Sequence, residues 1–147
     1  MDKEQQSVME KRVRDFLEDI RVNQAGTILG MLEPRFVECD AAEHSIVLAY
    51  PARPWEANPL GIMQGGVMAT MLDFTAAALS VCFAGDAPVT VSLQVSYLRG
   101  APVKGELLVR ARATKSGRQL VHAFVECWPA GEPDKPAATA NCVYIRT

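Results

Sequence analysis

Residues 64 to 83 read QGGVMATMLDFTAAALSVCF, a stretch unlike the rest of the chain. Good helix formers fill it, no proline interrupts it, and its two glycines stand at the start. Apolar residues cover nearly the whole helical circumference, which predicts a helix buried on most sides. About five turns give this helix a length of roughly 30 Å. We expect it to form the centre of the fold.

Four segments with the alternation of β-strands follow this helix, at Val89–Tyr97, Leu107–Ala113, Val121–Cys127 and Ala137–Arg146. A hairpin turn at Lys115–Arg118 joins the middle two. Their expected inner faces carry small side chains, which let a sheet approach a helix closely: Ala111, Ala113, Ala123, Cys127, Ala138, Ala140 and Cys142. The pattern predicts an α+β fold, one long helix held by a curved antiparallel sheet of about six strands.

The segment before the central helix supplies the remaining elements. Apolar residues from Met9 to Ile20 recur at helical spacing, which predicts an amphipathic helix that ends before Gly26. Strands are expected at Phe36–Asp40 and Ser45–Tyr50, followed by a loop at Pro51–Gly61. We therefore divide the chain into an N-terminal helix, 1–26, and one main domain, 27–147.

Length and composition set outer limits on function. The chain has 147 residues, 49% hydrophobic and 22% charged, as in an ordinary single globular domain. Its net charge of −2 makes a nucleic-acid-binding surface unlikely as the main role. The N-terminus has no apolar core of a signal peptide, and no uncharged run reaches the roughly 18 residues of a membrane span. We expect a cytoplasmic protein without a membrane partner, whose four cysteines are reduced and bind no metal.

Two features of the central helix indicate chemistry. Asp73 is the only charged residue between Ala57 and Gly85, and a mid-helix carboxylate among apolar neighbours is paired, solvated on an exposed strip, or used. Gly65 and Gly66 stand at the helix start, where free backbone N–H groups can stabilise an oxyanion. The alternative interpretation is that the two glycines only permit a tight turn from the loop into the helix. A nucleophile elbow, a phosphate loop and a dinucleotide-binding glycine motif are all lacking in the sequence.

These residues together resemble a known family. Asn58-Pro59-Leu60-Gly61-Ile62-Met63-Gln64-Gly65-Gly66, followed by Asp73 in MLDFTAAA, is similar to the hotdog-fold acyl-CoA thioesterases of the phenylacetate-degradation type. The later segment Val89–Ala101 resembles the strand that follows the helix in that family. The resemblance runs from about Arg35 to Tyr144.

The resemblance implies a role for each matching residue. Asp73 would be the general base or the nucleophile, and the Gly65 N–H would bind the thioester oxygen. Asn58 would bind the carbonyl or hold the loop, and Thr90 would help to place the attacking water. Gln64 stands where the family usually has histidine. Glutamine forms hydrogen bonds but does not titrate near neutral pH. Activity is expected to survive if this position only orients groups, and to be slow or lost if the position tunes charge.

Helix geometry predicts an oligomer. Gly65 and Asp73 are eight residues apart, roughly 12 Å along one axis. A base and an oxyanion donor must each lie within about 3 Å of the groups they serve, which one helix does not allow. Two antiparallel copies would allow it, so we expect a homodimer or a dimer of dimers.

Basic residues offer a second substrate contact. Arg99, Lys115 and Arg118 lie in a segment with only one acidic residue between Arg99 and Arg118, and such side chains suit the phosphates of coenzyme A. A solvated sheet face is the alternative interpretation. The sequence thus predicts acyl-CoA thioester hydrolysis without a cofactor or metal. A non-catalytic acyl-CoA-binding protein and, less favoured because neither His44 nor His122 is near the helix start, a dehydratase are the alternatives.

Overall fold

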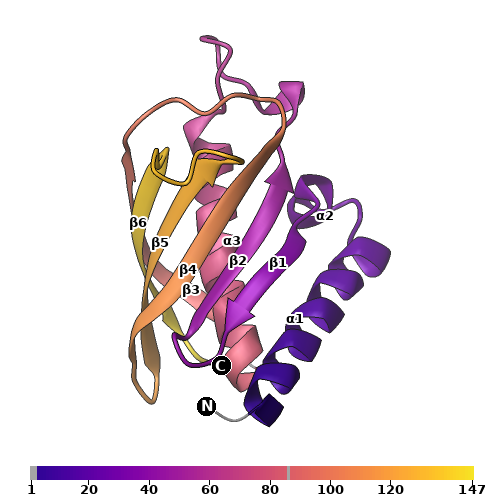
Figure 1. Cartoon of the computed structure of the whole chain (residues 1–147), viewed down its shortest axis with the longest axis vertical. Helices are drawn as coiled ribbons and strands as arrows, with labels where there is room; N and C mark the ends of the chain where they lie inside the picture. The colour runs from indigo at the N-terminus through magenta and orange to yellow at the C-terminus, as the bar shows by residue number, and fades with distance from the viewer. Residues whose placement is uncertain (1–2, 86) are drawn as a thin grey trace.

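The computed structural model describes residues 3–85 and 87–147. Its elements are α1 (Lys3–Asn23), α2 (Ile28–Leu32), β1 (Arg35–Asp40), β2 (Ser45–Pro51), the short 3-10 helix η1 (Pro54–Glu56), α3 (Gly65–Ala84), β3 (Val89–Tyr97), β4 (Glu106–Ser116), β5 (Leu120–Pro129) and β6 (Ala138–Ile145). The sheet has six antiparallel strands in the order β1-β2-β4-β5-β6-β3. It curves around α3, which lies along its inner face (Figure 1). The predicted α+β hotdog architecture is confirmed.

Small residues bring α3 close to the sheet, as the sequence predicts. Ala111, Ala123, Ala140 and Cys142 are all buried in one core with Met71 and Leu79 of the helix. One buried polar contact also joins the sheet to the helix: the Tyr50 hydroxyl is 2.8 Å from the Thr75 Oγ1. Burial raises the pKa of Tyr50 and keeps its hydroxyl neutral. The contact therefore fixes the register between β2 and the middle of α3.

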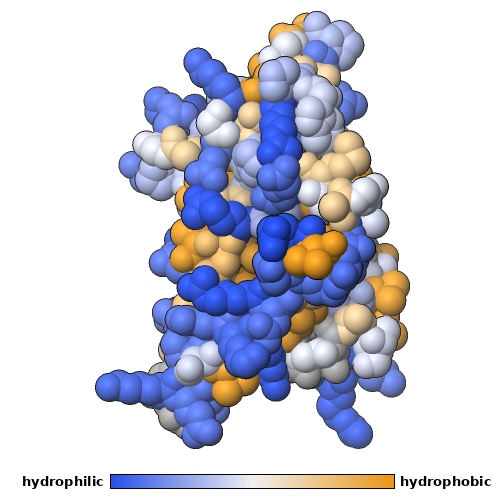
Figure 2. Space-filling view, turned by 90° about the vertical axis from the view of Figure 1, so that its right-hand side faces the viewer, coloured by the Kyte–Doolittle hydropathy of each residue, from blue (hydrophilic) through white to orange (hydrophobic). Residues whose placement is uncertain are grey.

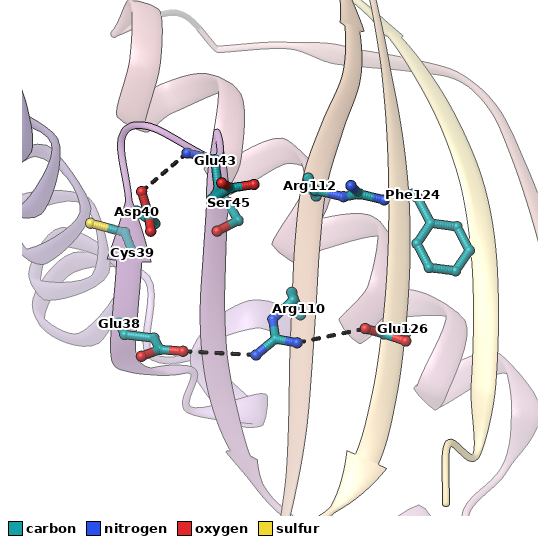
Figure 3. Close-up of a pocket in the computed structure, with 9 residues that line it drawn as sticks. All are labelled: Glu38, Cys39, Asp40, Glu43, Ser45, Arg110, Arg112, Phe124 and Glu126. Carbon is teal, nitrogen blue, oxygen red and sulfur yellow. Dashed lines mark hydrogen bonds and ion pairs between the residues drawn. The ribbon is translucent and has the colours of Figure 1, made fainter. Parts of the chain in front are cut away.

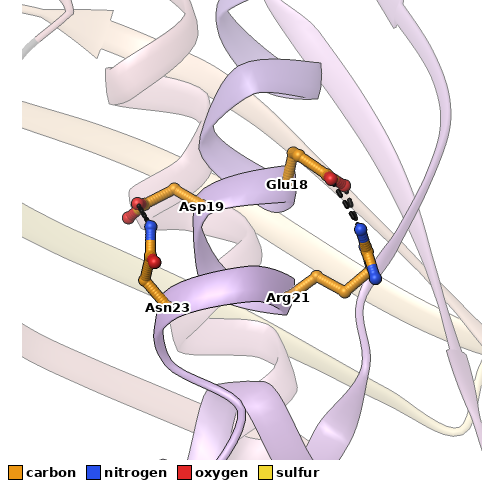
Figure 4. Close-up of polar contacts among 4 residues, drawn as sticks. All are labelled: Glu18, Asp19, Arg21 and Asn23. Atoms are coloured by element: carbon orange, nitrogen blue, oxygen red, sulfur yellow. Dashed lines mark hydrogen bonds and ion pairs between the residues drawn. The ribbon is translucent and has the colours of Figure 1, made fainter.

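The N-terminal helix α1 packs against β1 and against one side of α3. Its buried face adds Met9, Val13, Leu17 and Ile20 to the common core, and the rings of Phe16 and Phe74 stack at 5.7 Å. The outer face is hydrophilic (Figure 2) and carries contacts within the helix, such as Arg21 with Glu18 and Asn23 with Asp19 (Figure 4). The prediction of an amphipathic helix here is confirmed, with its end at Asn23.

Two short helices depart from the expected loops. α2 begins at a cap where Thr27 Oγ1 accepts a hydrogen bond from the Gly30 N–H, and it spans five residues. η1 interrupts the loop that was expected at 51–61. Both are shorter than the window over which helical periodicity can be recognised.

The cysteines and the long apolar helix are possible disulfide, metal or membrane features. All four cysteines are free, and burial raises the pKa of Cys127 and of Cys142 to about 12, so both are neutral thiols. No cluster able to hold a metal occurs among the described residues. In the same residues only Gly65–Phe83, 19 residues long, is apolar enough to cross a membrane, and 56% of it is already buried as the core helix.

Candidate active site

A tight loop sets the start of α3. Asn58 Oδ1 accepts hydrogen bonds from the N–H groups of Leu60 (2.9 Å) and Ile62 (3.3 Å). The Asn58 N–H donates to the Ile62 carbonyl at 2.7 Å, and the chain turns at Gly61 with a φ of 79°. Of the two roles predicted for Asn58, holding the loop is the one its Oδ1 performs here.

The first turn of α3 presents free backbone donors. Gln64 is the N-cap residue, its side chain is exposed, and it makes no capping hydrogen bond. Within the described chain, the N–H groups of Gly65 and Gly66 donate to no backbone carbonyl outside the helix, and the first turn has no partner for them inside it. A side chain on Gly66 would meet open space. This turn can accept a negatively charged oxygen from outside the protomer.

Tyr97, at the end of β3, packs over this turn. Its hydroxyl donates a 2.6 Å hydrogen bond to the Gly65 carbonyl, and a Cβ on Gly65 would lie 3.1 Å from the Tyr97 ring. A larger residue at 65 would therefore need the Tyr97 ring to move by a few tenths of an ångström. The sequence reasoning placed Tyr97 in a strand but missed this contact, because the two residues are 32 positions apart.

Asp73 is half-buried in the middle of α3, and Thr90 at the start of β3 contacts it. Thr90 Oγ1 donates a 2.7 Å hydrogen bond to Asp73 Oδ1. No described residue donates a hydrogen bond to Oδ2, so one carboxylate oxygen is held and the other is available. This arrangement suits a base or nucleophile of fixed orientation.

A β-bulge makes the Thr90 contact possible. Strict alternation would put Thr90 on the face opposite to Leu93 and Tyr97. The pairing of β3 with β6 shifts register between Thr90 and Ser92, so one extra residue on β3 reverses the alternation there. Thr90 and Tyr97 consequently both face α3.

The two halves of the candidate site lie at opposite ends of β3. Gly65 is next to Tyr97 at one end, and Asp73 is next to Thr90 at the other. Seven strand positions separate Thr90 from Tyr97, roughly 20 Å of extended chain. One protomer does not bring the predicted oxyanion donor and the predicted base together.

The surface between these two halves is open. β3 pairs only with β6, so its other edge is free. Val89, Val91 and Tyr97 of this edge strand are 56%, 58% and 52% exposed. A partly exposed strip of α3 lies beside it, formed by Gly66, Thr70, Asp73, Ala77 and Val81. A long apolar edge of this kind is usually covered by another chain.

The basic residues divide between the same two ends. Arg99 follows β3 near the start of α3, where its N–H donates to the Ala137 carbonyl. Lys115 and Arg118 stand at the hairpin between β4 and β5, whose end is next to β6 and the start of β3. A single protomer therefore does not gather the three residues into one phosphate site.

A separate pocket of about 430 Å³ lies on the outer face of the sheet (Figure 3). Its main cation, Arg110, is 3.8 Å from Glu38, 3.7 Å from Glu126, and stacks over the Trp128 ring. Because these charges pair with one another and lie on the face opposite to α3, this pocket is not part of the candidate site.

Fold and site together define a hotdog protein with a carboxylate on the central helix and a glycine amide at its start. The model of the Thioesterase superfamily matches residues 60–135, more than half of the chain. The protein belongs to this superfamily.

Individual relatives agree with this assignment. Acyl-coenzyme A thioesterase 13 of Mus musculus is 28% identical over 87 residues, which are 58% of this chain and 62% of that relative. A phenylacetic acid degradation-related protein from Ralstonia eutropha JMP134 is 28% identical, with a TM-score of 0.75 over 88% of this chain and 98% of its own. The E. coli PaaI protein of the phenylacetic acid degradation operon shares the fold, with a TM-score of 0.79 at 17% identity, over 95% and 96% of the two chains.

Proposed function

We propose that the protein hydrolyses acyl-CoA thioesters at two equivalent sites, each shared between two protomers that pair along β3. The observation that carries this proposal is the position of the two half-sites. Asp73 with Thr90 and Gly65 with Tyr97 mark the two ends of one strand whose outer edge is free.

Antiparallel pairing of two β3 strands would complete the site. A two-fold axis near the middle of the strand places Thr90 of one protomer opposite Tyr97 of the other. Asp73 then approaches the first turn of the partner's α3, with its free amides. The same pairing covers the exposed valines of β3 and the open strip of α3.

The chemistry follows from this arrangement. The thioester carbonyl oxygen accepts a hydrogen bond from the partner's Gly65 N–H, and the positive end of the α3 dipole adds to the stabilisation. Asp73 removes a proton from water, whose oxygen attacks the carbonyl carbon. The tetrahedral oxyanion collapses, the C–S bond breaks, and the CoA thiolate leaves and takes up a proton. Direct attack by Asp73 through an anhydride, which water then hydrolyses, uses the same geometry. Thr90 holds Oδ1 in either case.

Coenzyme A fits the distribution of charge. In an antiparallel dimer, Arg99 of one protomer comes to the same end as Lys115 and Arg118 of the partner. This grouping gathers three cations at one end of the shared site, where they can hold the phosphates of CoA beyond its pantetheine arm. A protein from Streptococcus mutans with the same fold, at a TM-score of 0.69 and 19% identity, has been crystallised bound to acetyl CoA.

A non-catalytic acyl-CoA-binding protein is the second candidate, and Gln64 favours it. Glutamine stands where the resembling family usually has histidine, and its side chain does not titrate near neutral pH. The Gln64 side chain is also exposed and makes no capping hydrogen bond. A dehydratase is less well supported, because His122 lies on β5 and His44 in the turn before β2, where its ring contacts Phe83 at 4.5 Å.

Complementation between inactive variants tests both the shared site and the reaction. Asp73→Asn removes the base. Gly65→Pro removes the N–H at the first helical position, where proline is well tolerated and where Gln64 already has the extended backbone, ψ 133°, that a residue before proline needs. Gly65→Ala is the matched control, because it has the same contact with Tyr97 but keeps its N–H.

Each inactive variant alone should lose a hundredfold or more in turnover. Unfolding and refolding the two together at equal amounts should recover about a quarter of wild-type activity, since half the dimers are mixed and one of their two sites is intact. Recovery of no activity in mixed dimers, with both variants folded, would refute the shared site. Absence of turnover in the wild type, combined with acyl-CoA binding, would establish the binding protein instead.

A further inference from the structure

A second cavity lies at the C-terminal end of α3. This end of the helix is at the lower end of the molecule in Figure 1. The cavity has a volume of about 230 Å³, and it is lined by Ser80 and Phe83 of α3, Tyr144 of β6, Arg146 just after β6, His44 and the β4–β5 hairpin. This volume is several times the roughly 30 Å³ share of one liquid water molecule. The cavity can hold a small organic molecule.

Three polar side-chain atoms in this cavity form no hydrogen bond with any residue that the structure describes. They are Ser80 Oγ, the Tyr144 hydroxyl and Arg146 Nε, each shielded from solvent. Ser80 is 4% exposed and Tyr144 is 1% exposed, so neither hydroxyl can rely on bulk water. Burial raises the pKa of Tyr144, and the nearby Ser80 hydroxyl opposes that rise, yet the two oxygens do not meet with the geometry of a hydrogen bond. Buried polar groups without partners are rare and costly in a folded protein.

All three atoms can donate a hydrogen bond, and one belongs to a cation. Arg146 forms one hydrogen bond with a neutral group, from Nη2 to Ser116 Oγ at 2.7 Å, and the described residues give it no ion pair. None of the described residues that line the cavity is acidic. The group that complements three donors and one positive charge is an anion that only accepts hydrogen bonds, and a carboxylate has two oxygens for this purpose.

We propose that this cavity is a binding site for a small carboxylate, held by Arg146, Tyr144 and Ser80. Exposed His44 and Ser116 line its mouth, and Lys115 and Arg118 on the same hairpin add positive charge near the entrance. The site is distinct from the proposed catalytic site. Ser80 is seven residues beyond Asp73, almost two full turns and about 10 Å along the same face of α3.

This spacing allows two sources for the carboxylate. One is a free carboxylate from solution. The other is the terminal carboxylate of an acyl chain whose thioester lies at Asp73, which needs an extended chain of about nine carbons to span the roughly 10 Å between them. Both sources use the same three donors.

Calorimetric titration of the full chain with sodium propionate, against sodium chloride at equal ionic strength, tests the proposal. We expect saturable binding of one propionate per protomer. Tyr144→Phe, which keeps the ring, and Arg146→Gln should each weaken binding at least tenfold, the scale of a lost hydrogen bond to a charged group. Arg112→Gln is the matched control, since it removes an exposed arginine from the outer sheet face and should not change affinity.

Absence of saturable heat, equal affinity in the Tyr144 and Arg146 variants, or equally tight binding of sulfate would overturn the carboxylate site. None of these outcomes depends on whether the protein hydrolyses thioesters. Azelaoyl-CoA and nonanoyl-CoA, titrated into Asp73→Asn, then distinguish the sources. Tighter binding of azelaoyl-CoA with displacement of propionate identifies the acyl chain, whereas equal binding with propionate retained identifies a free carboxylate.

Discussion

Thr90 Oγ1 donates a 2.7 Å hydrogen bond to Asp73 Oδ1, and it does so from a strand position that simple alternation would turn away from the helix. The bulge between Thr90 and Ser92 re-aims this hydroxyl. Bulges commonly serve such purposes beside active sites. The extra residue of the bulge thus allows Thr90 to orient the Asp73 carboxylate. This supports a functional role for Asp73, because a carboxylate that is simply solvated on the helix surface needs no such partner.

Removing the Thr90 hydroxyl should lower turnover without removing the base. We expect Thr90→Ala to reduce kcat about tenfold, the scale of one hydrogen bond to a charged group, while KM changes little. Thr90→Ser keeps the hydroxyl and should retain most of kcat. Steady-state kinetics on the best thioester measure both. A KM effect alone, or failure of serine to rescue, would contradict a positioning role for Thr90.

Neutralising Asp73 separates catalysis from binding. Asp73→Asn keeps the shape of the side chain but removes the base, so turnover should fall about a hundredfold or more. Affinity for CoA should hardly change, because the proposed phosphate contacts lie elsewhere. Turnover and acyl-CoA affinity are measured side by side, with the exposed Asp134→Asn as control. Wild-type turnover in Asp73→Asn would make the residue structural.

The sequence was sufficient to predict α3, because its apolar character on all sides is visible without any partner element. Strand alternation likewise predicted the four strands after α3, and the two before it were expected from their strand-like composition. Tyr97 over Gly65 could not be predicted in this way, since that contact depends on how β3 crosses the start of α3. The bulge at Thr90 was hidden because one unpaired residue leaves the apolar alternation of β3 unbroken. The separation of Arg99 from Arg118 appears only when the sheet order is known.

Charge on the free edge of β3 should prevent assembly. Val91 is 58% exposed on β3, and Val22 is 57% exposed on α1. We expect wild type to be at least a dimer by light scattering, and Val91→Lys to approach the monomer mass of 16.0 kDa with loss of turnover. Val22→Lys makes the same chemical change away from this edge and should alter neither property. An active Val91→Lys monomer would exclude a shared site.

Gln64 provides a test of what the N-cap position contributes. Gln64→His restores the residue usual in the resembling family and should keep or raise turnover, whereas Gln64→Ala should lower it a few-fold by removing a hydrogen-bonding group. Neither change should affect folding, because the side chain is exposed and makes no capping bond. The measurement is kcat/KM across pH 5 to 9. Complete loss of activity in Gln64→His would show a specific requirement for the amide.

Glu56 is expected to make stability depend on pH. Its side chain is 1% exposed, Oε1 accepts a 2.7 Å bond from the Arg53 N–H, and Oε2 has no partner. Burial raises the pKa of Glu56 above its ordinary value of 4.5, against the smaller opposing effects of Arg53. The native state therefore holds this proton at pH values where the unfolded chain has released it. Stability from this group is complete below pH 4.5 and is lost as pH rises through the higher, native pKa.

Glu56→Gln replaces the carboxyl with a neutral group of the same shape, so it should remove this pH dependence. We expect the urea midpoint of Glu56→Gln to exceed that of wild type at pH 8 and the two to converge near pH 4. Glu43→Gln, at an exposed position in the turn before β2, is the control and should follow wild type at both pH values. Because the Glu56 carbonyl accepts the Gln64 N–H at 2.8 Å, the same residue also fixes the start of α3. A wild-type midpoint that rises between pH 4 and 8 relative to Glu56→Gln would show that the carboxylate is stabilised in the fold, contrary to the sign derived from its burial.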